Sequence, residues 1–252
     1  MHFAGVDLAW AGRNPTGIAV VDEGGVLVDI CAVRTDDEVL NALRPHLRAE
    51  CIVGFDAPLV VTNPTGQRPA ETALNRDFRR FEAGAHPSNT GKPEFAGGPR
   101  AARLAAELKL DVDPYSPAPR RALEVYPHAA TVALFRLPHT LKYKAKPGRD
   151  IERLRSELLR LMDLVETLAG ARVGLRVCDH EGWTRLRRAV LTAQRKSELR
   201  RAEDPVDAVV CAYVALYAHR RPDDITIYGD AATGYIATPS LPSDVLTTRT
   251  GG

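Results

Sequence analysis

The sequence predicts an α/β protein with a mixed five-stranded sheet in the order 3-2-1-4-5. Helices should cover both faces of this sheet, and a long insertion should follow the fourth strand. Three observations support this fold class. The chain opens with strand-like segments joined by a tight turn. A helical segment then leads into a short apolar strand, a crossover that implies parallel pairing with the first strand. Residues 57–100 are rich in Pro, Gly, Asn and Thr, which is typical of a long functional loop.

Composition limits the protein classes that the chain can belong to. With 252 residues, 44% of them hydrophobic and 26% charged, it is typical of a soluble globular protein, and we expect one domain over residues 1–252. A net charge of +2 gives no overall basic signature of a nucleic-acid binder. The chain has no signal-like segment and no apolar stretch of membrane-spanning length, so we expect a cytoplasmic protein without a membrane partner. Its four scattered cysteines are expected to be buried thiols.

The first part of the chain predicts an antiparallel start followed by a crossover. We expect strands at residues 2–9, 16–21 and 26–33, with Asp22-Glu23-Gly24-Gly25 as the turn between the second and the third. A helix at 36–48 follows, with Thr35 and Asp36 as candidate caps. It leads to a fourth strand at 51–55, which should lie parallel to the first.

The rest of the chain is predicted to be mostly helical. Apolar residues recur there at the spacing of amphipathic helices. The expected helices cover residues 71–82, 99–110, 151–168 and 181–200, and a further one begins at 203 or 204 and runs to about 218. The expected strands cover residues 121–125, 225–228 and 235–238.

Two aspartates lie at or near the carboxyl ends of apolar strands. Asp7 interrupts the first strand, and Asp56 follows the fourth. If these strands are parallel neighbours, their tips lie about 5 Å apart and both carboxylates face the crevice where open α/β sheets bind ligands. Two anions that close repel each other, and a hard divalent cation such as Mg²⁺ or Mn²⁺ would relieve the repulsion. Alternatively, each aspartate only ends its strand and accepts a backbone N–H.

A third acidic feature lies late in the chain, in DPVDAVVCA. Asp204 and Asp207 are three residues apart and would project from one face of a helix. Asp204 could simply cap this helix, with Pro205 at its first position. Asp207 is harder to explain as a cap, because a helix needs only one and this residue leads directly into the apolar face.

Acids on the first strand, on the parallel fourth strand and at the start of a late apolar helix resemble the ribonuclease H-like superfamily. The last part resembles the RuvC-type resolvase signature. The segments GVDLAW, IVGFDAPL, ETALNRDFRR, LEVYPHAA, LKYK and DPVDAVVCA, in this order over roughly residues 3–240, are similar to the DUF429 family of predicted nucleases. The resemblance implies a ribonuclease H-like fold. It also implies that Asp7, Asp56 and Asp207 are metal ligands, with Asp204 as a fourth. The RuvC-type enzymes carry Glu where this chain carries Asp56.

Further charged residues are candidates for the same site. Glu124 lies at the carboxyl end of the fifth predicted strand and could lie on the rim of the crevice, or it could pair at the surface with a neighbouring arginine such as Arg120 or Arg121. Basic side chains beside a metal crevice can bind phosphate, although such residues often only form a solvated face. The candidates for this role are Arg76, Arg79, Lys142 and Lys144. The histidines lack the spacing of zinc ligands, and none is assigned to a metal.

These features together predict metal-dependent phosphodiester hydrolysis by a two-metal mechanism, with Mg²⁺ or Mn²⁺ as cofactor and nucleic acid as partner. Two alternatives remain. A phosphotransferase of the actin-like or sugar-kinase type could use GRNPTGIAV to hold phosphate, although the chain has no second glycine-rich motif. A non-catalytic nucleic-acid-binding module could retain the acids for structure alone. An exposed apolar edge on the third strand would permit a homodimer.

Overall fold

The protein is described by a computed structural model that covers residues 1–9, 15–146 and 148–244. Its sheet confirms the predicted order, β3-β2-β1-β4-β5. The first strand pairs antiparallel with the second and parallel with the fourth, which in turn is parallel to the fifth. The strands are β1 (His2–Asp7), β2 (Thr16–Asp22), β3 (Leu27–Val33), β4 (Cys51–Phe55) and β5 (Arg120–Glu124). The carboxyl ends of β1, β4 and β5 therefore meet at one edge.

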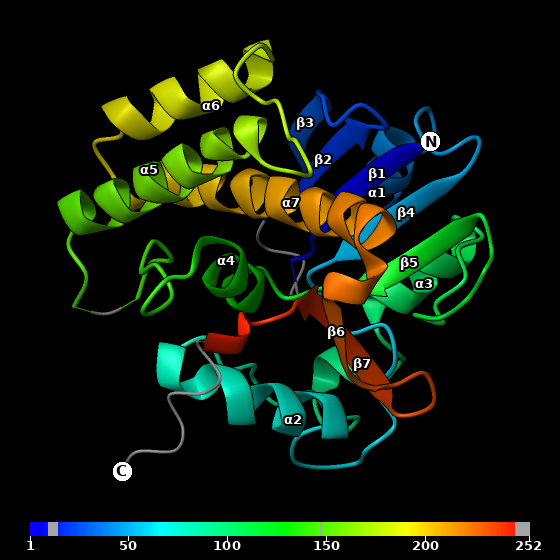
Figure 1. The fold of residues 1–252 in the computed structure, drawn as a ribbon. Helices are drawn as coiled ribbons and strands as arrows, with labels where there is room; N and C mark the ends of the chain where they lie inside the picture. Colours follow the sequence, from blue (N-terminus) through cyan, green and yellow to red (C-terminus); the bar gives the residue numbers. More distant parts are fainter. Residues whose placement is uncertain (10–14, 147, 245–252) are drawn as a thin grey trace.

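Helices cover both faces of the sheet, as Figure 1 shows. The long helix α7 crosses one face and contacts β1, β2 and β4, while α1 and α3 lie on the other. The α-helices are α1 (Asp36–Leu43), α2 (Pro69–Phe78), α3 (Arg100–Glu107), α4 (Pro127–Phe135), α5 (Ile151–Thr167), α6 (Glu181–Thr192) and α7 (Lys196–Arg220). Short 3-10 turns occupy Arg79–Phe81, Pro93–Phe95, Leu168–Gly170 and Pro222–Asp224. This arrangement agrees with a ribonuclease H-like fold.

The local signals read from the first part of the chain form as expected. Thr35 caps α1, because its hydroxyl accepts the Glu38 N–H while the Glu38 carboxylate accepts the Thr35 N–H. The turn between β2 and β3 closes on Asp22, whose carbonyl accepts the N–H of Gly25. Gly25 has a φ of 77°, a conformation that glycine adopts easily.

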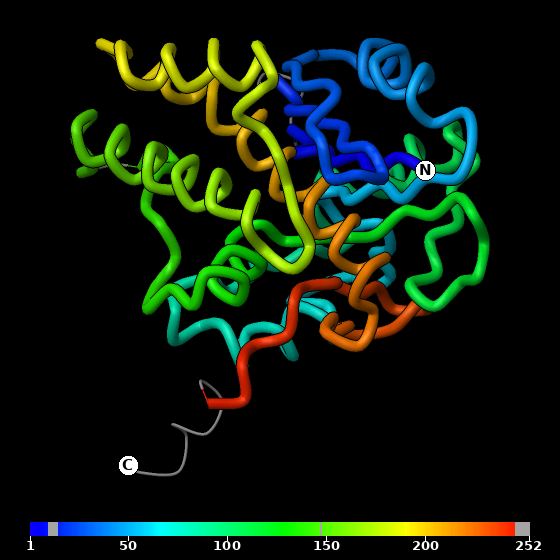
Figure 2. The backbone as a smooth tube through the Cα atoms, turned by 45° about the horizontal axis from the view of Figure 1, so that its top comes forward, coloured from blue at the N-terminus to red at the C-terminus, as the bar shows by residue number. Residues whose placement is uncertain are grey.

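Two glycines allow α7 to lie directly on the sheet. A Cβ atom on Gly5 would lie 1.9 Å from the Ala208 carbonyl oxygen, and one on Gly17 would lie 2.0 Å from the Asp204 carbonyl oxygen. Any larger residue at these positions would push the helix away. Figure 2 shows the result, with α7 in orange beside the blue strands. Because Gly5 and Asp7 share one face of β1, this contact brings the acidic part of α7 next to Asp7.

The insertion after β4 carries α2, which packs against a second, two-stranded sheet. This sheet consists of β6 (Ile225–Asp230) and β7 (Gly234–Pro239), which contain the two short strands expected near the C-terminus. Tyr235 on β7 donates from its buried hydroxyl to the Ala122 carbonyl on β5. The hairpin and the insertion are thereby attached to the main sheet near the carboxyl end of β5.

The predicted boundary between the last two helices is wrong. The helix expected at 181–200 ends at Thr192, and α7 begins at Lys196 rather than at 203 or 204. Pro205 therefore lies inside α7, although proline has no N–H to donate and normally interrupts a helix. Leu199 and Ala202 before it are as buried as the residues after it, so packing maintains the helix on both sides of the proline.

Other expectations also differ from the structure. The helix α4 was not predicted, because Tyr126-Pro127 was interpreted only as the end of a strand, yet Pro127 takes the first position of that helix. Of the four cysteines, all expected to be buried, Cys178 is exposed and Cys31 is half-buried, and none forms a disulfide. The proposed phosphate-holding segment GRNPTGIAV lies partly outside the described residues. β3 stands at the edge of the sheet, and dimerisation through it stays a prediction.

Candidate functional site: an acidic cluster around Lys144

The carboxyl edge of the sheet brings two of the predicted aspartates together. Asp7 is the last residue of β1, and Asp56 directly follows β4. The backbone N–H of Asp56 donates to the Val6 carbonyl, 2.8 Å away, which fixes Asp56 beside the end of β1. The prediction that these two strands are parallel neighbours is confirmed.

Helix α7 supplies three more acids. Glu203, Asp204 and Asp207 lie in its third and fourth turns, next to the tip of β1, and Glu203 and Asp207 are only 3% and 1% exposed. Glu203 and Asp207 are four residues apart and therefore share a helix face. Because α7 begins at Lys196, Asp204 is not its N-cap, and the structural explanation considered for this residue is wrong.

A single lysine lies among these acids. The Lys144 Nζ atom lies 2.5 Å from Asp207 Oδ2, 3.2 Å from Asp7 Oδ2 and 3.5 Å from Asp204 Oδ1. Three carboxylates from two different elements thus converge on one nitrogen. Lys144 was predicted to bind phosphate. In this conformation it neutralises the aspartates instead, which its sequence position gave no means of foreseeing. We call Asp7, Asp56, Glu203, Asp204, Asp207 and Lys144 the acidic cluster.

The segment between α4 and α5 positions Lys144. The Tyr143 hydroxyl is buried and donates to Asp207 Oδ1 at 2.6 Å, so this neighbour of the lysine is bound to the same aspartate. Arg149 donates to the backbone carbonyls of Lys142 and Lys144. Sequence reasoning missed Tyr143 as a member of the site. The lysines of this segment and the resemblance of LKYK to a family motif were the signals that pointed to it.

Burial raises the pKa values of several carboxyl groups of the cluster. Burial raises the pKa of Asp56 to about 7, and the nearby Lys144 only partly opposes this. The pKa of Glu203 is also about 7, and burial is again the main cause. Burial raises the pKa of Asp7 well above its usual range. Burial alone would lower the pKa of Lys144, but the Asp207 and Asp7 carboxylates raise it, so the lysine keeps its charge.

The cluster is short of positive charge. It holds five acidic side chains and one ammonium group, and Glu203 Oε1 is buried without a hydrogen-bond partner in the described part of the chain. Carboxylate oxygens are the ligands that Mg²⁺ and Mn²⁺ prefer, so the donor set fits such an ion. In this conformation, no three His, Cys, Asp or Glu side chains among the described residues are arranged to hold a metal.

Glu124 lies in a separate buried ion network. It is 3% exposed, and both of its oxygens are bound by Arg68, at 2.5 and 2.9 Å. Arg68 also contacts Glu71 at 2.9 Å, and the backbone N–H groups of Leu59 and Ser88 donate to the two glutamates. The expected surface pairing of Glu124 with Arg120 or Arg121 is wrong, since Arg68 binds it instead. A catalytic role for Glu124 stays a prediction.

The other predicted phosphate-binding residues lie apart from the acidic cluster. Arg76 on α2 and Arg79 in the 3-10 turn that follows it are exposed and line a cavity to which no acid of the cluster contributes. Lys142 forms an ion pair with Glu82 at 2.6 Å. Their role toward phosphate stays a prediction.

His128 lies beside the cluster without belonging to it. Its ring packs against Tyr126 and Tyr143, and its Nδ1 atom lies 3.0 Å from the Thr140 hydroxyl. Burial lowers the pKa of His128 to about 4, so the ring is neutral at physiological pH. It supports Tyr143, and no metal role was predicted for it.

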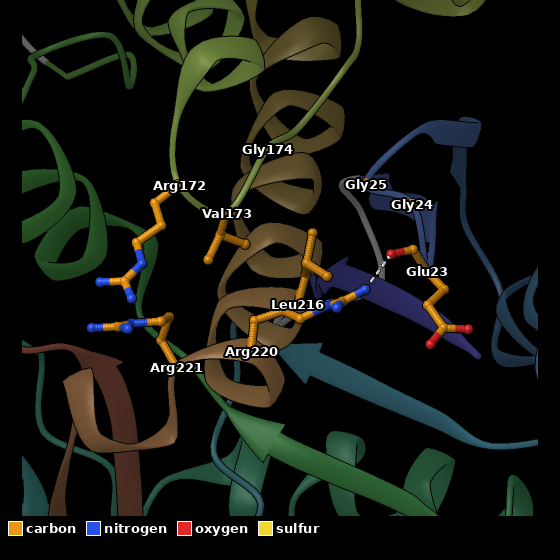
Figure 3. Close-up of a pocket in the computed structure, with 9 residues that line it drawn as sticks. All are labelled: Glu23, Gly24, Gly25, Arg172, Val173, Gly174, Leu216, Arg220 and Arg221. Atoms are coloured by element: carbon orange, nitrogen blue, oxygen red, sulfur yellow. Dashed lines mark hydrogen bonds between the residues drawn. The ribbon is translucent and has the colours of Figure 1, made fainter.

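A second cavity lies at the other end of α7, where Figure 3 shows three arginines around it. Arg220 donates to the Glu23 carbonyl, and Arg221 forms an ion pair with Asp224. Positive charge at a helix C-terminus interacts favourably with the helix dipole, which accounts for Arg220 and Arg221. Arg220 and Asp207 are thirteen residues apart on the helix, or about 20 Å. This cavity is therefore separate from the acidic cluster.

No helix in the ranges that the structure describes is both long and apolar enough to cross a membrane. No curated protein and no solved structure matches the chain. One family does match, described as "Protein of unknown function (DUF429)", over residues 5–233. This range includes every acid of the cluster as well as Lys144. The match spans most of the chain, so the protein is a member of the DUF429 family.

Proposed function

We propose that this protein is a metal-dependent phosphodiester hydrolase, a nuclease that uses the acidic cluster as its active site. One observation carries the proposal. Asp7 and Asp56 on two neighbouring strands and Asp204 and Asp207 on the helix packed over them gather at the carboxyl edge of the sheet. Open α/β sheets bind ligands at this edge. Purely structural acids would not need to be so numerous or so poorly neutralised.

The residues that would hold the ion are Asp7, Asp56 and Asp207, with Asp204 beside them. When bound, Mg²⁺ or Mn²⁺ would supply the charge that activates water and stabilises the oxygen leaving phosphorus. Asp7 lies on the central strand β1, and Asp207 lies in the buried face of α7, so packing fixes the positions of both. A preorganised ligand set of this kind is what an active site requires.

Two further residues would act on the substrate and on water. Glu203 has a pKa of about 7 and an oxygen, Oε1, without a hydrogen-bond partner among the described residues, so it could accept a proton from an attacking water molecule. Lys144 could contact a phosphate oxygen through Nζ, because its side chain is 27% exposed at the mouth of the cluster. A phosphodiester is an anion and would enter this acidic site only together with compensating positive charge.

The test is cleavage of fluorescent DNA and RNA oligonucleotides by the purified full chain with Mg²⁺ or Mn²⁺. We expect cleavage that EDTA abolishes and added Mn²⁺ restores. Asp7→Asn should lower the rate at least about 100-fold, because it removes a rigid ligand and charge from the reacting centre. Its melting temperature should not fall, since the variant also removes a buried anion.

Asp179→Asn is the matched control. Asp179 is an exposed aspartate outside the cluster, so its substitution should leave the cleavage rate unchanged. Wild-type turnover in Asp7→Asn would contradict the nuclease proposal. Metal-independent nucleic-acid binding by Asp7→Asn, Asp56→Asn with no cleavage by the wild type would favour a binding module instead.

A further inference from the structure

We propose that Lys144 is an internal counter-cation that holds the metal-free site together and is displaced from between the aspartates when a divalent cation binds. This inference rests on the proposed function, because it assumes that the cluster is a metal site. It adds a regulatory contact. The protein would carry its own competitor for the metal.

The contacts of Nζ put the ammonium where a metal ion would be expected. It lies within 3.5 Å of one oxygen from each of Asp7, Asp204 and Asp207, the same side chains that would ligate the ion. A divalent cation bound to these oxygens at about 2.1 Å would lie next to the ammonium. Two cations that close repel each other, and so they could not share the site.

The ammonium only partly satisfies the site. Asp207 Oδ2 forms an ion pair with Nζ but accepts no hydrogen bond of acceptable geometry, and Glu203 Oε1 has no partner among the described residues. Both atoms are buried in residues at most 3% exposed. A divalent cation brings twice the charge of the lysine and binds several oxygens at once. The cluster should therefore exchange the lysine for the metal once the metal concentration is high enough.

Lys144 can leave without unfolding the segment that carries it. Tyr143 is held by Asp207, Lys142 by Glu82, and the carbonyl of Lys144 by Arg149, so the backbone is fixed on both sides of the lysine. Four flexible methylene groups connect this backbone to the ammonium. The Lys144 side chain is 27% exposed, compared with 1% for Asp207, which leaves the ammonium a route toward solvent.

The first experiment compares Mn²⁺ binding by the wild type, Lys144→Met and Lys146→Met in isothermal titration calorimetry. Lys146 is an exposed lysine two residues further along, so its variant removes the same charge from the same segment. We expect Lys144→Met to bind Mn²⁺ at least about tenfold more tightly than the wild type, because the competing ammonium is gone. Lys146→Met should bind like the wild type.

Equal or weaker Mn²⁺ binding by Lys144→Met would overturn the inference and leave the proposed function standing if the wild type binds metal and cleaves. No Mn²⁺ binding by any of the proteins would overturn both. Tighter binding by Lys144→Met without nucleic-acid cleavage by the wild type would support the inference and remove the nuclease proposal.

The second experiment needs no variant and remains decisive if Lys144→Met does not fold. Wild-type protein is labelled briefly with an amine-acylating reagent, with and without saturating Mn²⁺, and each lysine is quantified by mass spectrometry. Displacement predicts that Lys144 is labelled several times faster with Mn²⁺, while Lys146 is unaffected. Unchanged or slower labelling of Lys144 would contradict displacement.

Discussion

Two buried groups of charged side chains lie close together in this protein, and they are built differently. In the ion network, Arg68 lies between Glu71 and Glu124, and both carboxylates also accept backbone N–H groups. In the acidic cluster, the ammonium group of Lys144 lies within 3.5 Å of three of the five acids, and Glu203 keeps an oxygen without a partner among the described residues. A small cavity lined by both Asp56 and Glu124 lies between the two groups.

The difference separates a structural role from a functional one. The ion network joins the insertion to the end of β5, and Arg68 gains charge-assisted hydrogen bonds to both glutamates. The acidic cluster carries more negative charge than folding requires, and the fold maintains it at a cost in stability. Buried charge that is poorly neutralised is typical of sites that bind a ligand.

The largest effect on stability should follow from breaking the ion network. Arg68→Met leaves Glu71 and Glu124 buried without their shared cation, and loss of one partner of a buried ion pair typically costs about 3–5 kcal/mol. We expect the melting temperature to fall by at least about 6 °C in thermal unfolding followed by circular dichroism. Arg188→Met, on the exposed side of α6, is the control and should change stability by less than about 0.5 kcal/mol. A variant as stable as the wild type would show that Arg68 does not anchor the insertion.

Removing a negative charge from the acidic cluster should raise the stability of the protein rather than lower it. The pKa of Asp56 is raised from 3.8 to about 7 in the folded protein, so the folded state binds a proton more tightly than the unfolded chain. The stabilisation that protonated Asp56 contributes is therefore lost as the pH rises from about 4 to about 7. Asp56→Asn should melt several degrees higher than the wild type at pH 8 without metal, and this gain should shrink at pH 5. A lower melting temperature at pH 8 would mean that Asp56 stabilises the fold.

The smallest effect concerns the contact that joins Tyr143 to the cluster. Tyr143→Phe removes the hydroxyl that donates to Asp207 Oδ1, a hydrogen bond to a charged group, and should lower stability by about 1–2 kcal/mol. Urea unfolding measures this loss directly. Asp207 keeps its ion pair with Lys144 in this variant, so the loss of stability should be smaller than that of Arg68→Met. An equally large loss would contradict the distinction between a structural ion network and a functional acidic cluster.

The sequence predicted the sheet and the edge where the site lies because both depend on local patterns. Apolar alternation located the strands, and the crossover after α1 placed the ends of β1 and β4 side by side. Asp7, Asp56 and Asp207 could be chosen because acids are unusual in apolar segments. The mutual repulsion of Asp7 and Asp56 suggested a divalent cation, and the resemblance to a known family added Asp207 as a ligand and the nuclease chemistry.

Other features depend on long-range packing that no local pattern records. α7 continues through Pro205 because residues on both sides are buried against the sheet, and this removes the capping explanation for Asp204. Lys144 reaches the cluster from a segment 60 residues away from Asp204 along the chain. The partner of Glu124 is Arg68, 56 residues distant, whereas sequence reasoning considered only its neighbours.

The most direct test of the central claim, that the acidic cluster is a divalent-cation site, is a Mn²⁺ soak of crystals of the full chain read by anomalous scattering. We predict an anomalous peak between the carboxylates of Asp7 and Asp207, with Nζ of Lys144 moved out of the gap. Crystals of Asp7→Asn soaked in the same way should show a much weaker peak. Saturating Mn²⁺ that gives no peak in the cluster, with Lys144 still bound to the aspartates, would contradict the account.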